Sequence, residues 1–125
     1  MGINWSLLNN GINTQQYNAI AVKDSIMFIA SDQGLFRTTD YGNTWDSLQT
    51  IQGSALCVII VDNFVYVGML NGIHRSSNWG NDWVNINEGL PVHKTCTSLT
   101  FYNSTIFAGI YDLPYLKIFK STNYG

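Results

Sequence analysis

Charged residues are scarce in this 125-residue chain: only 11% are Asp, Glu, Lys or Arg, and the formal net charge is −2. Nucleic-acid binding depends on clustered Lys and Arg, so the composition argues against a nucleic-acid partner. No apolar run approaches the roughly 20 residues of a membrane-spanning helix, so we expect no membrane partner. The hydrophobic fraction of 46% is enough for one domain with a buried core.

Cysteine and histidine are also sparse, with two of each. Cys57 and Cys96 lack zinc-ligand spacing, and neither His74 nor His93 has a second ligand at a suitable distance in the sequence. We therefore predict no metal and no cofactor, and free buried thiols in preference to a disulfide. The N-terminus has neither the basic start nor the apolar core of a signal peptide. Abundant Asn, Ser, Thr and Gly mildly favour an extracytoplasmic protein but set no compartment.

A sustained apolar periodicity of 3.6 residues is absent too, which argues against helices. Short apolar segments instead alternate with turn residues such as Asp, Asn and Gly, a pattern typical of strands joined by tight turns. The fold predicted from this pattern is all-β. The predicted strands are residues 19–22, 26–30, 35–38, 57–61, 65–68, 73–76, 98–101, 106–109 and 117–120.

One seven-residue stretch recurs along the chain. It runs from Thr39 to Trp45, recurs from Ser77 to Trp83, and begins again at residues 122–125. Its pattern is Ser/Thr, Asp/Asn, aromatic, Gly, two polar residues and Trp. Asp or Asn can hydrogen-bond the backbone of a tight turn, Gly supplies a positive φ, and Trp brings a large apolar ring. The spacing near 40 residues is typical of propeller blades.

These stretches resemble the Asp-box (BNR) repeat, Ser-x-Asp-x-Gly-x-x-Trp, and the whole chain resembles the photosystem-assembly-factor-like and sortilin-like repeat propellers. The resemblance implies that each box is a structural turn, remote from the active face of those members that are enzymes. Asn78 and Asn123 depart from the pattern and carry no charge. The predicted structural residues are Thr39, Asp40, Gly42 and Trp45, then Ser77, Asn78, Gly80 and Trp83, and finally Thr122, Asn123, Gly125 and Trp5.

We expect blades of four antiparallel strands at residues 17–52 and 54–90, and a third blade at 94–125 that lacks its fourth strand. Residues 3–12 contain a strand, at 5–9, that matches the fourth strands after Trp45 and Trp83. Propellers have 4–8 blades, and an open three-blade arc would expose a strand edge and apolar faces. We therefore predict a homodimer closed as a six-bladed ring, in which each N-terminal strand completes the partner's last blade. The alternative is a fragment of a longer propeller.

Catalytic residues are hard to place in this sequence. A resemblance to sialidases would require an arginine triad, a Tyr/Glu nucleophile pair and an acid Asp. Arg37, Arg75 and Lys120 instead share one repeat position, three residues before each box Asp or Asn, which suits a scaffold role. No paired carboxylates stand out. We predict that the protein is not an enzyme; a sialidase-like glycoside hydrolase is the alternative, and a designed or evolved repeat fragment that only assembles is a third possibility.

One surface is a candidate for binding. In propellers of this kind, the loops from fourth to first strands and from second to third strands share a face, and loops on rigid scaffolds often carry function. Tyr111 and Tyr115 flanking Asp112 would suit a carbohydrate or a peptide, although an incidental loop insertion is as good an explanation. We predict a non-enzymatic binding or scaffold module. The candidate binding face comprises Glu88, His93, Lys94, Tyr111, Asp112 and Tyr115.

Overall fold

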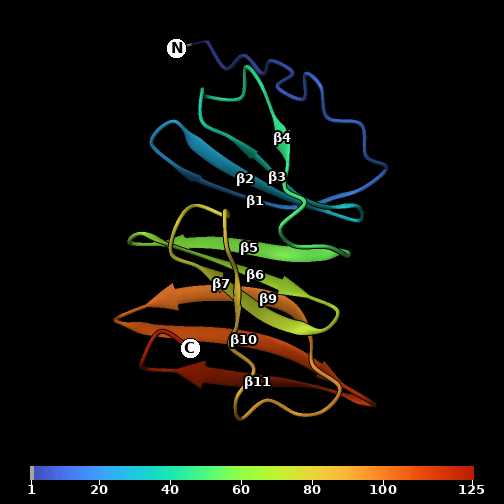
Figure 1. Ribbon diagram of the computed structural model, residues 1–125, viewed down its shortest axis with the longest axis vertical. Helices are drawn as coiled ribbons and strands as arrows, with labels where there is room; N and C mark the ends of the chain where they lie inside the picture. Colours follow the sequence, from blue (N-terminus) through green and yellow to red (C-terminus); the bar gives the residue numbers. More distant parts are fainter. Residues whose placement is uncertain (1) are drawn as a thin grey trace.

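The computed structural model describes residues 2–125, and within them the chain is all-β, with strands and turns but no helix. This confirms the predicted fold class. Three antiparallel sheets are stacked one on another along the long axis of the molecule (Figure 1). Successive strands are neighbours within each sheet, as expected for blades built from consecutive hairpins.

The first two sheets have four strands each. In the first sheet the order is β1 (Tyr17–Lys23), β2 (Ile26–Ser31), β3 (Gly34–Thr38) and β4 (Asp46–Ser47). In the second sheet it is β5 (Ala55–Val61), β6 (Phe64–Met69), β7 (Gly72–Ser76) and β8 (Val84–Asn85). The fourth strands are short, because only two residues of each pair with the third strand.

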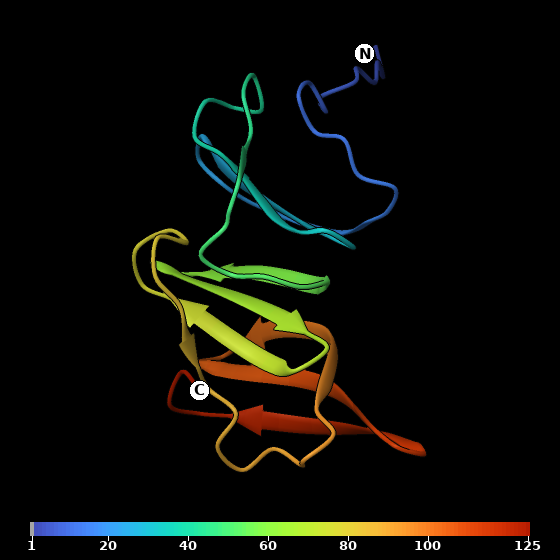
Figure 2. The ribbon, with the colours of Figure 1, turned by 45° about the vertical axis from the view of Figure 1, so that its right-hand side comes forward.

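The third sheet has three strands in the described chain: β9 (Thr95–Tyr102), β10 (Thr105–Asp112) and β11 (Tyr115–Ser121). Strand β10 lies in the middle and pairs with both neighbours. The outer edge of β11 therefore carries no fourth strand from residues 2–125. The N-terminal segment lies beyond the first sheet, at the other end of the stack (Figure 2).

The strand predicted at residues 5–9 does not form in the single chain, where these residues belong to no sheet. The segment does not pair because of where it lies in the molecule. The first sheet already has its own fourth strand, and the unpaired edge of β11 lies at the opposite end of the molecule.

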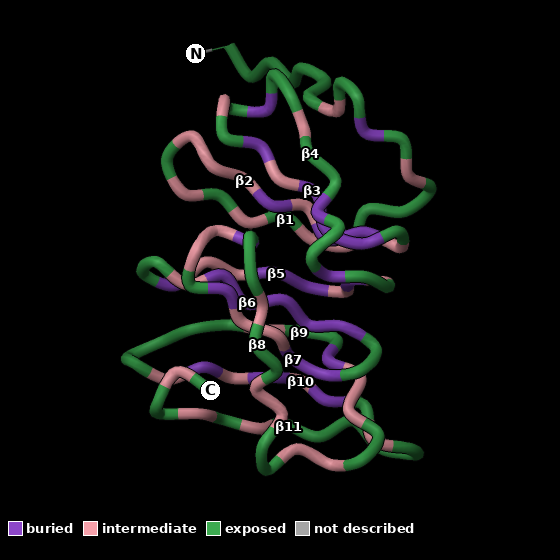
Figure 3. The backbone as a smooth tube through the Cα atoms, in the orientation of Figure 1, coloured by how far each residue is buried: buried purple, intermediate pink, exposed green. Residues whose placement is uncertain are grey.

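Buried residues are concentrated in the strands of the three sheets (Figure 3), and the apolar ones form two clusters. The first junction, between the first and second sheets, buries Phe28, Leu35 and Leu48 against Val58 and Val67. The second junction, between the second and third sheets, buries a matching cluster: Cys57, Val61, Tyr66, Ile73, Cys96, Ile106, Ala108 and Ile110. The stack therefore has two cores, one at each junction.

Cys57 and Cys96 face each other across the second junction as buried free thiols, with their Sγ atoms 3.9 Å apart. The hydrogen bond with the Cys57 thiol, together with burial, raises the pKa of Cys96, so this side chain stays protonated at neutral pH. Gly68 makes the close approach possible, because a Cβ there would lie 2.7 Å from the Cys96 sulfur. The pair is a packing feature of the core.

Candidate functional site

Each box forms a tight turn around the side chain of one Asp or Asn. Oδ1 of Asp40 accepts hydrogen bonds from the Thr38 hydroxyl at 2.6 Å and the Thr44 N–H at 2.9 Å, and Oδ2 accepts one from the Thr44 hydroxyl at 2.7 Å. These bonds, that from Thr38 foremost, lower the pKa of Asp40 to about 2. Tyr41 and Gly42 then adopt positive φ angles of 61° and 86°.

Asparagine preserves the turn in the other two boxes. Asn78 accepts the Asp82 N–H through Oδ1 at 2.8 Å, and its amide donates to the Asp82 carboxylate at 2.8 Å. Asn123 accepts the Ser121 hydroxyl at 2.7 Å. The lost charge therefore does not open the turn, because the amide oxygen takes the place of Oδ1 of Asp40 as the acceptor.

The hydroxyl that supports each turn lies one residue earlier than predicted. Thr38, Ser76 and Ser121 each accept the N–H of the box glycine, at 3.0, 2.8 and 2.8 Å. Thr38 and Ser76 are buried, whereas the predicted residues Thr39, Ser77 and Thr122 are exposed. The spacing Ser-x-Asp of the repeat pattern identifies the correct residues, since one position separates the hydroxyl from the Asp.

Two kinds of contact link one sheet to the box of the next. The first is a side chain three residues after the box Trp: Leu48 packs on Gly80, where a Cβ would lie 2.7 Å from Leu48 Cδ1, and Ile86 occupies the same space beside Gly125. The box glycines are therefore needed for close approach as well as for φ.

The second kind of contact is the repeat-matched cation. Arg37 Nη1 on β3 donates to the Trp79 carbonyl at 2.7 Å, and Arg75 Nη1 on β7 donates to the Tyr124 carbonyl at 2.8 Å. Each arginine thus reaches the box of the following sheet. Lys120 has the same position on β11, but it is exposed at the outer end of the third sheet.

The N-terminal segment already follows the path of a fourth strand from a preceding blade. Leu8 lies on Gly42, where a Cβ would be 2.7 Å from Leu8 Cδ2, just as Leu48 lies on Gly80. The Leu8 carbonyl accepts the indole N–H of Trp45 at 3.0 Å. Trp5, however, is 95% exposed, whereas the equivalent Trp83 is partly buried against the core of the first junction.

The outer edge of β11 lacks a fourth strand from residues 2–125. Leu35 and Ile73, at equivalent positions on β3 and β7, are 1% and 6% exposed, and their carbonyls accept the N–H groups of Leu48 and Ile86. Ile118 holds that position on β11 and is 81% exposed. Leu116 on the same strand is also exposed, as are Ile20 and Val22 on the outer strand of the first sheet.

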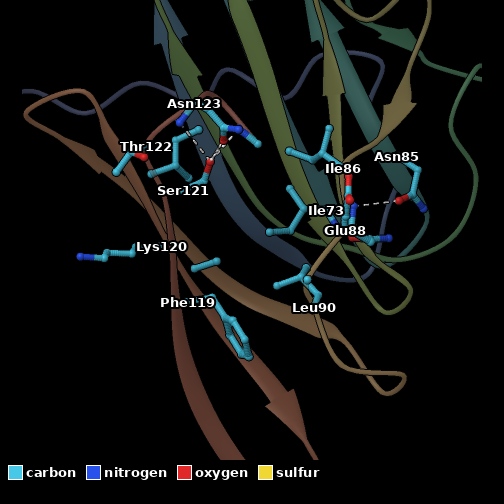
Figure 4. A pocket seen from close by; sticks show the side chains of 15 residues that line it. Ile73, Asn85, Ile86, Glu88, Leu90, Phe119, Lys120, Ser121, Thr122 and Asn123 are labelled. Carbon is cyan, nitrogen blue, oxygen red and sulfur yellow. Dashed lines mark hydrogen bonds between the residues drawn. The ribbon is translucent and has the colours of Figure 1, made fainter.

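A cavity of about 600 Å³ lies between the end of β8 and the end of β11. One wall is formed by Ile86, Glu88 and Leu90, and the opposite wall by Phe119 and residues 120–123 (Figure 4). Its floor includes Ile73, Ile106 and Ala108 from the core of the second junction. The cavity therefore joins apolar core surface to the polar residues of the third box.

The six residues of the predicted binding face lie on the loop after β8, the loop before β9, and strands β10 and β11. Glu88 lines the cavity beside β8. Asp112 is held by Lys117 at 2.7 Å, and the Lys94 ammonium donates to the Val92 carbonyl at 3.3 Å. His93 is exposed in the loop that enters β9.

The two tyrosines lie on the hairpin formed by β10 and β11. Asp112 pairs with Tyr115 and Tyr111 pairs with Leu116 across the hairpin. Paired residues share a face and successive residues alternate, so Tyr111 and Tyr115 lie on opposite faces of the sheet. The side chains of Tyr115 and Asp112 share one face, and Tyr115 is 69% exposed whereas Tyr111 is 41% exposed.

Residues 2–125 contain neither a cluster of metal ligands nor a membrane-spanning helix. No group of three His, Cys, Asp or Glu side chains is arranged to hold a metal ion. No helix there is long and apolar enough to cross a membrane.

The stacked sheets of consecutive hairpins define β-propeller blades, and similar solved structures agree with this class. The chain superposes on an ancestral GH74 enzyme with a TM-score of 0.68 and 23% identity, covering 88% of this chain and 15% of that one. It superposes on the computationally designed Ika4 protein with a TM-score of 0.70 and 16% identity, covering 100% and 77%.

A third similar structure is that of YCF48 bound to D1 peptide, with a TM-score of 0.58 and 18% identity over 83% of this chain and 36% of that one. The chain thus spans less than two thirds of the GH74 enzyme and of YCF48. No protein-family model matches the sequence, and a comparison with curated proteins found no match either.

Proposed function

We propose that this protein is a non-enzymatic scaffold module whose three blades assemble with a second copy into a closed six-bladed propeller. The assembled ring would present the loops around Tyr111–Tyr115 as a surface for a peptide or a carbohydrate. The observation that carries the proposal is the complementarity of the two ends of the stack. At one end, Leu8 of a spare N-terminal segment lies on Gly42 as Leu48 lies on Gly80, and at the other end the third sheet has no fourth strand from residues 2–125.

Exposed apolar surface at both ends supports this assembly. Ile20 and Val22 are 59% and 56% exposed at the N-terminal end, and Leu116 and Ile118 are exposed at the other. Contiguous apolar surface of this kind marks interaction sites. A head-to-tail contact buries both ends at once and repeats around a ring.

The number of copies follows from the blade count. Propellers contain 4–8 blades, and six is the only multiple of three in that interval. Two copies therefore close the ring, with one identical contact on each side. A polymer would form only if the rotation at the contact failed to close.

The arrangement of the arginines favours a scaffold over a sialidase-like hydrolase. Arg37 and Arg75 are both committed to carbonyl groups of the following box, so neither is free to bind a substrate carboxylate. A panel of fluorogenic glycosides tests this half of the proposal. We expect no turnover above the uncatalysed rate, and saturable hydrolysis of any glycoside would overturn the non-enzymatic assignment.

Sedimentation equilibrium over a range of protein concentrations tests the other half. We expect a reversible monomer–dimer equilibrium. A purified 125-residue chain that stays monomeric at the highest micromolar concentrations would contradict the proposal and would favour a longer propeller that completes its own third blade.

A further inference from the structure

We infer that the cavity between β8 and β11 is the binding site for Trp5 of a second copy, with the backbone of Leu8 pairing to Ile118. This inference rests on the proposed assembly and assigns the residues that hold it together. It treats the cavity as one half of a protein–protein interface and Trp5 as the side chain that anchors the other half.

The first junction shows what occupies the equivalent space. There, the Trp83 ring packs on the box glycine Gly80 and against the shared core. Its indole N–H donates to the Thr50 hydroxyl at 3.2 Å. Trp83 follows Gly80 by three residues, so the equivalent ring in the second junction would lie beside Gly125, where the cavity is found.

The lining of the cavity suits an indole. Ile73, Ile86, Leu90 and Phe119 offer apolar surface to the ring. Thr50, which accepts the indole N–H of Trp83, follows Trp45 by five residues. Glu88 follows Trp83 by the same interval, and it therefore holds the equivalent place as acceptor for the Trp5 indole. An aromatic anchor with one polar group at its tip in an apolar pocket is the usual composition of an interface hot spot.

The backbone register agrees with this placement. The N–H groups of Leu48 and Ile86 donate to the carbonyls of Leu35 and Ile73, at 2.9 and 3.0 Å. Ile73 pairs with Gly68, and Ile118 pairs with the equivalent Gly109. The Ile118 carbonyl therefore points to the open edge of β11, where the Leu8 N–H of a second copy would meet it.

Asn9 extends the same register by one residue. Its counterpart Asn87 accepts the Ile73 N–H at 2.7 Å and donates to the Asn71 carbonyl at 3.1 Å. Both asparagines begin the same local turn, because Asn9 and Asn87 carbonyls accept the N–H three residues later at 3.0 Å. Asn9 of a second copy would thus accept the Ile118 N–H and satisfy the open edge.

The first test uses sedimentation equilibrium to compare the variants Trp5→Ala and Leu7→Ala. Both side chains are exposed in the single chain. Leu7 is the matched control, because its equivalents Ser47 and Asn85 stay exposed even where a fourth strand is formed. We expect Trp5→Ala to raise the dimer Kd by about 30-fold or more, the scale of an interface hot spot. Leu7→Ala should change the Kd by less than about 3-fold.

The second test traps the register by cross-linking. Arg75 pairs with Val84, so the equivalent pair is Lys120 with Ser6 of a second copy. The variant carrying Ser6→Cys and Lys120→Cys should oxidise to a covalent dimer, since directly paired strand residues lie within disulfide reach. The variant carrying Ser6→Cys and Asn103→Cys, which places the second thiol in the far β9–β10 turn, should not.

The outcomes separate the two proposals. Two results would show that the Trp5 site is wrong while the assembly stands. In one, the wild-type chain dimerises but Trp5→Ala changes the Kd no more than Leu7→Ala does. In the other, the wild-type chain dimerises but only the control cysteine pair cross-links. If the wild-type chain remains monomeric, both proposals fall. Circular dichroism of Trp5→Ala at a concentration where the chain is monomeric should match that of the wild type, which confirms an intact fold.

Discussion

A single buried hydroxyl organises each box turn. Thr38 donates to Asp40 and accepts the Gly42 N–H, so one side chain holds both arms of the turn. Ser76 makes the equivalent contacts in the second box. The adjacent Thr39 and Ser77 face solvent. Neighbouring residues of nearly the same chemistry therefore have very different structural importance.

Replacing Thr38 by Val tests this difference. The substitution keeps the shape but removes the hydroxyl, which leaves the buried Gly42 N–H without its acceptor. We expect a loss of about 1–3 kcal/mol in unfolding free energy, measured by urea denaturation. Thr39→Val is the matched control and should stay within about 0.5 kcal/mol. Equal effects of the two substitutions would contradict the assignment of the supporting hydroxyl.

Asp40 gives the protein one predictable acid response. Its pKa falls from an unfolded value of about 3.9 to about 2 because Thr38 and Thr44 hydrogen-bond the carboxylate. A lowered pKa means that the stabilisation is complete above the unfolded pKa and is lost as pH falls toward 2. NMR titration of the Asp40 carboxyl should report a midpoint near 2, and Asp40→Asn should lose less stability than the wild type over this interval. A midpoint near 3.9 would refute the hydrogen-bonded geometry.

At the scale of the strand and its sheet, the junctions between sheets hold the molecule together. Each arginine spans from a third strand to the next box, and each fourth-strand Leu or Ile fills the space above a box glycine. Arg75 also lies 5.0 Å from the Phe64 ring, which adds a cation–π contact. Arg37 and Arg75 therefore link the sheets at the two junctions within residues 2–125, whereas Lys120 holds the same repeat position at the outer end.

Arg75→Met should weaken the second junction. The substitution keeps an apolar stem but removes the charged donor to the Tyr124 carbonyl, for which we expect a loss of about 1.5–3 kcal/mol in unfolding free energy. Lys120→Met serves as the control, because Lys120 reaches no following box within the chain. Under dilute, monomeric conditions it should leave stability unchanged within about 0.5 kcal/mol. A comparable loss from both variants would show that the cation position matters locally and does not link sheets.

For the whole molecule, the sequence predicts the blades well and the ends poorly. Strands such as Cys57–Val61 and Val65–Gly68 are apolar runs between strong turn residues, so local chemistry specifies them. Residues 5–9 carry the fourth-strand pattern but form no strand in the single chain, because the third strand that lacks a fourth-strand partner among residues 2–125, β11, lies at the other end of the stack. The faces of Tyr111 and Tyr115 could not be predicted for a different reason: strand register, which decides the face of each side chain, is not visible in composition.

The cavity between β8 and β11 could not be predicted either, since it arises from what two neighbouring sheets leave unfilled. Its walls come from residues more than 30 positions apart in the chain, such as Ile86 and Phe119. Only the repeat register, applied to the finished structure, assigns it an occupant. The same register underlies our proposal that both ends of the stack are halves of one contact.

Native mass spectrometry over a range of protein concentrations tests closure of the ring most directly. The account predicts a single assembled species at twice the 14.0 kDa mass of the chain, with no larger oligomer as the concentration rises, because two copies leave no free end. A ladder of longer oligomers, or the monomer alone at micromolar concentration, would contradict it.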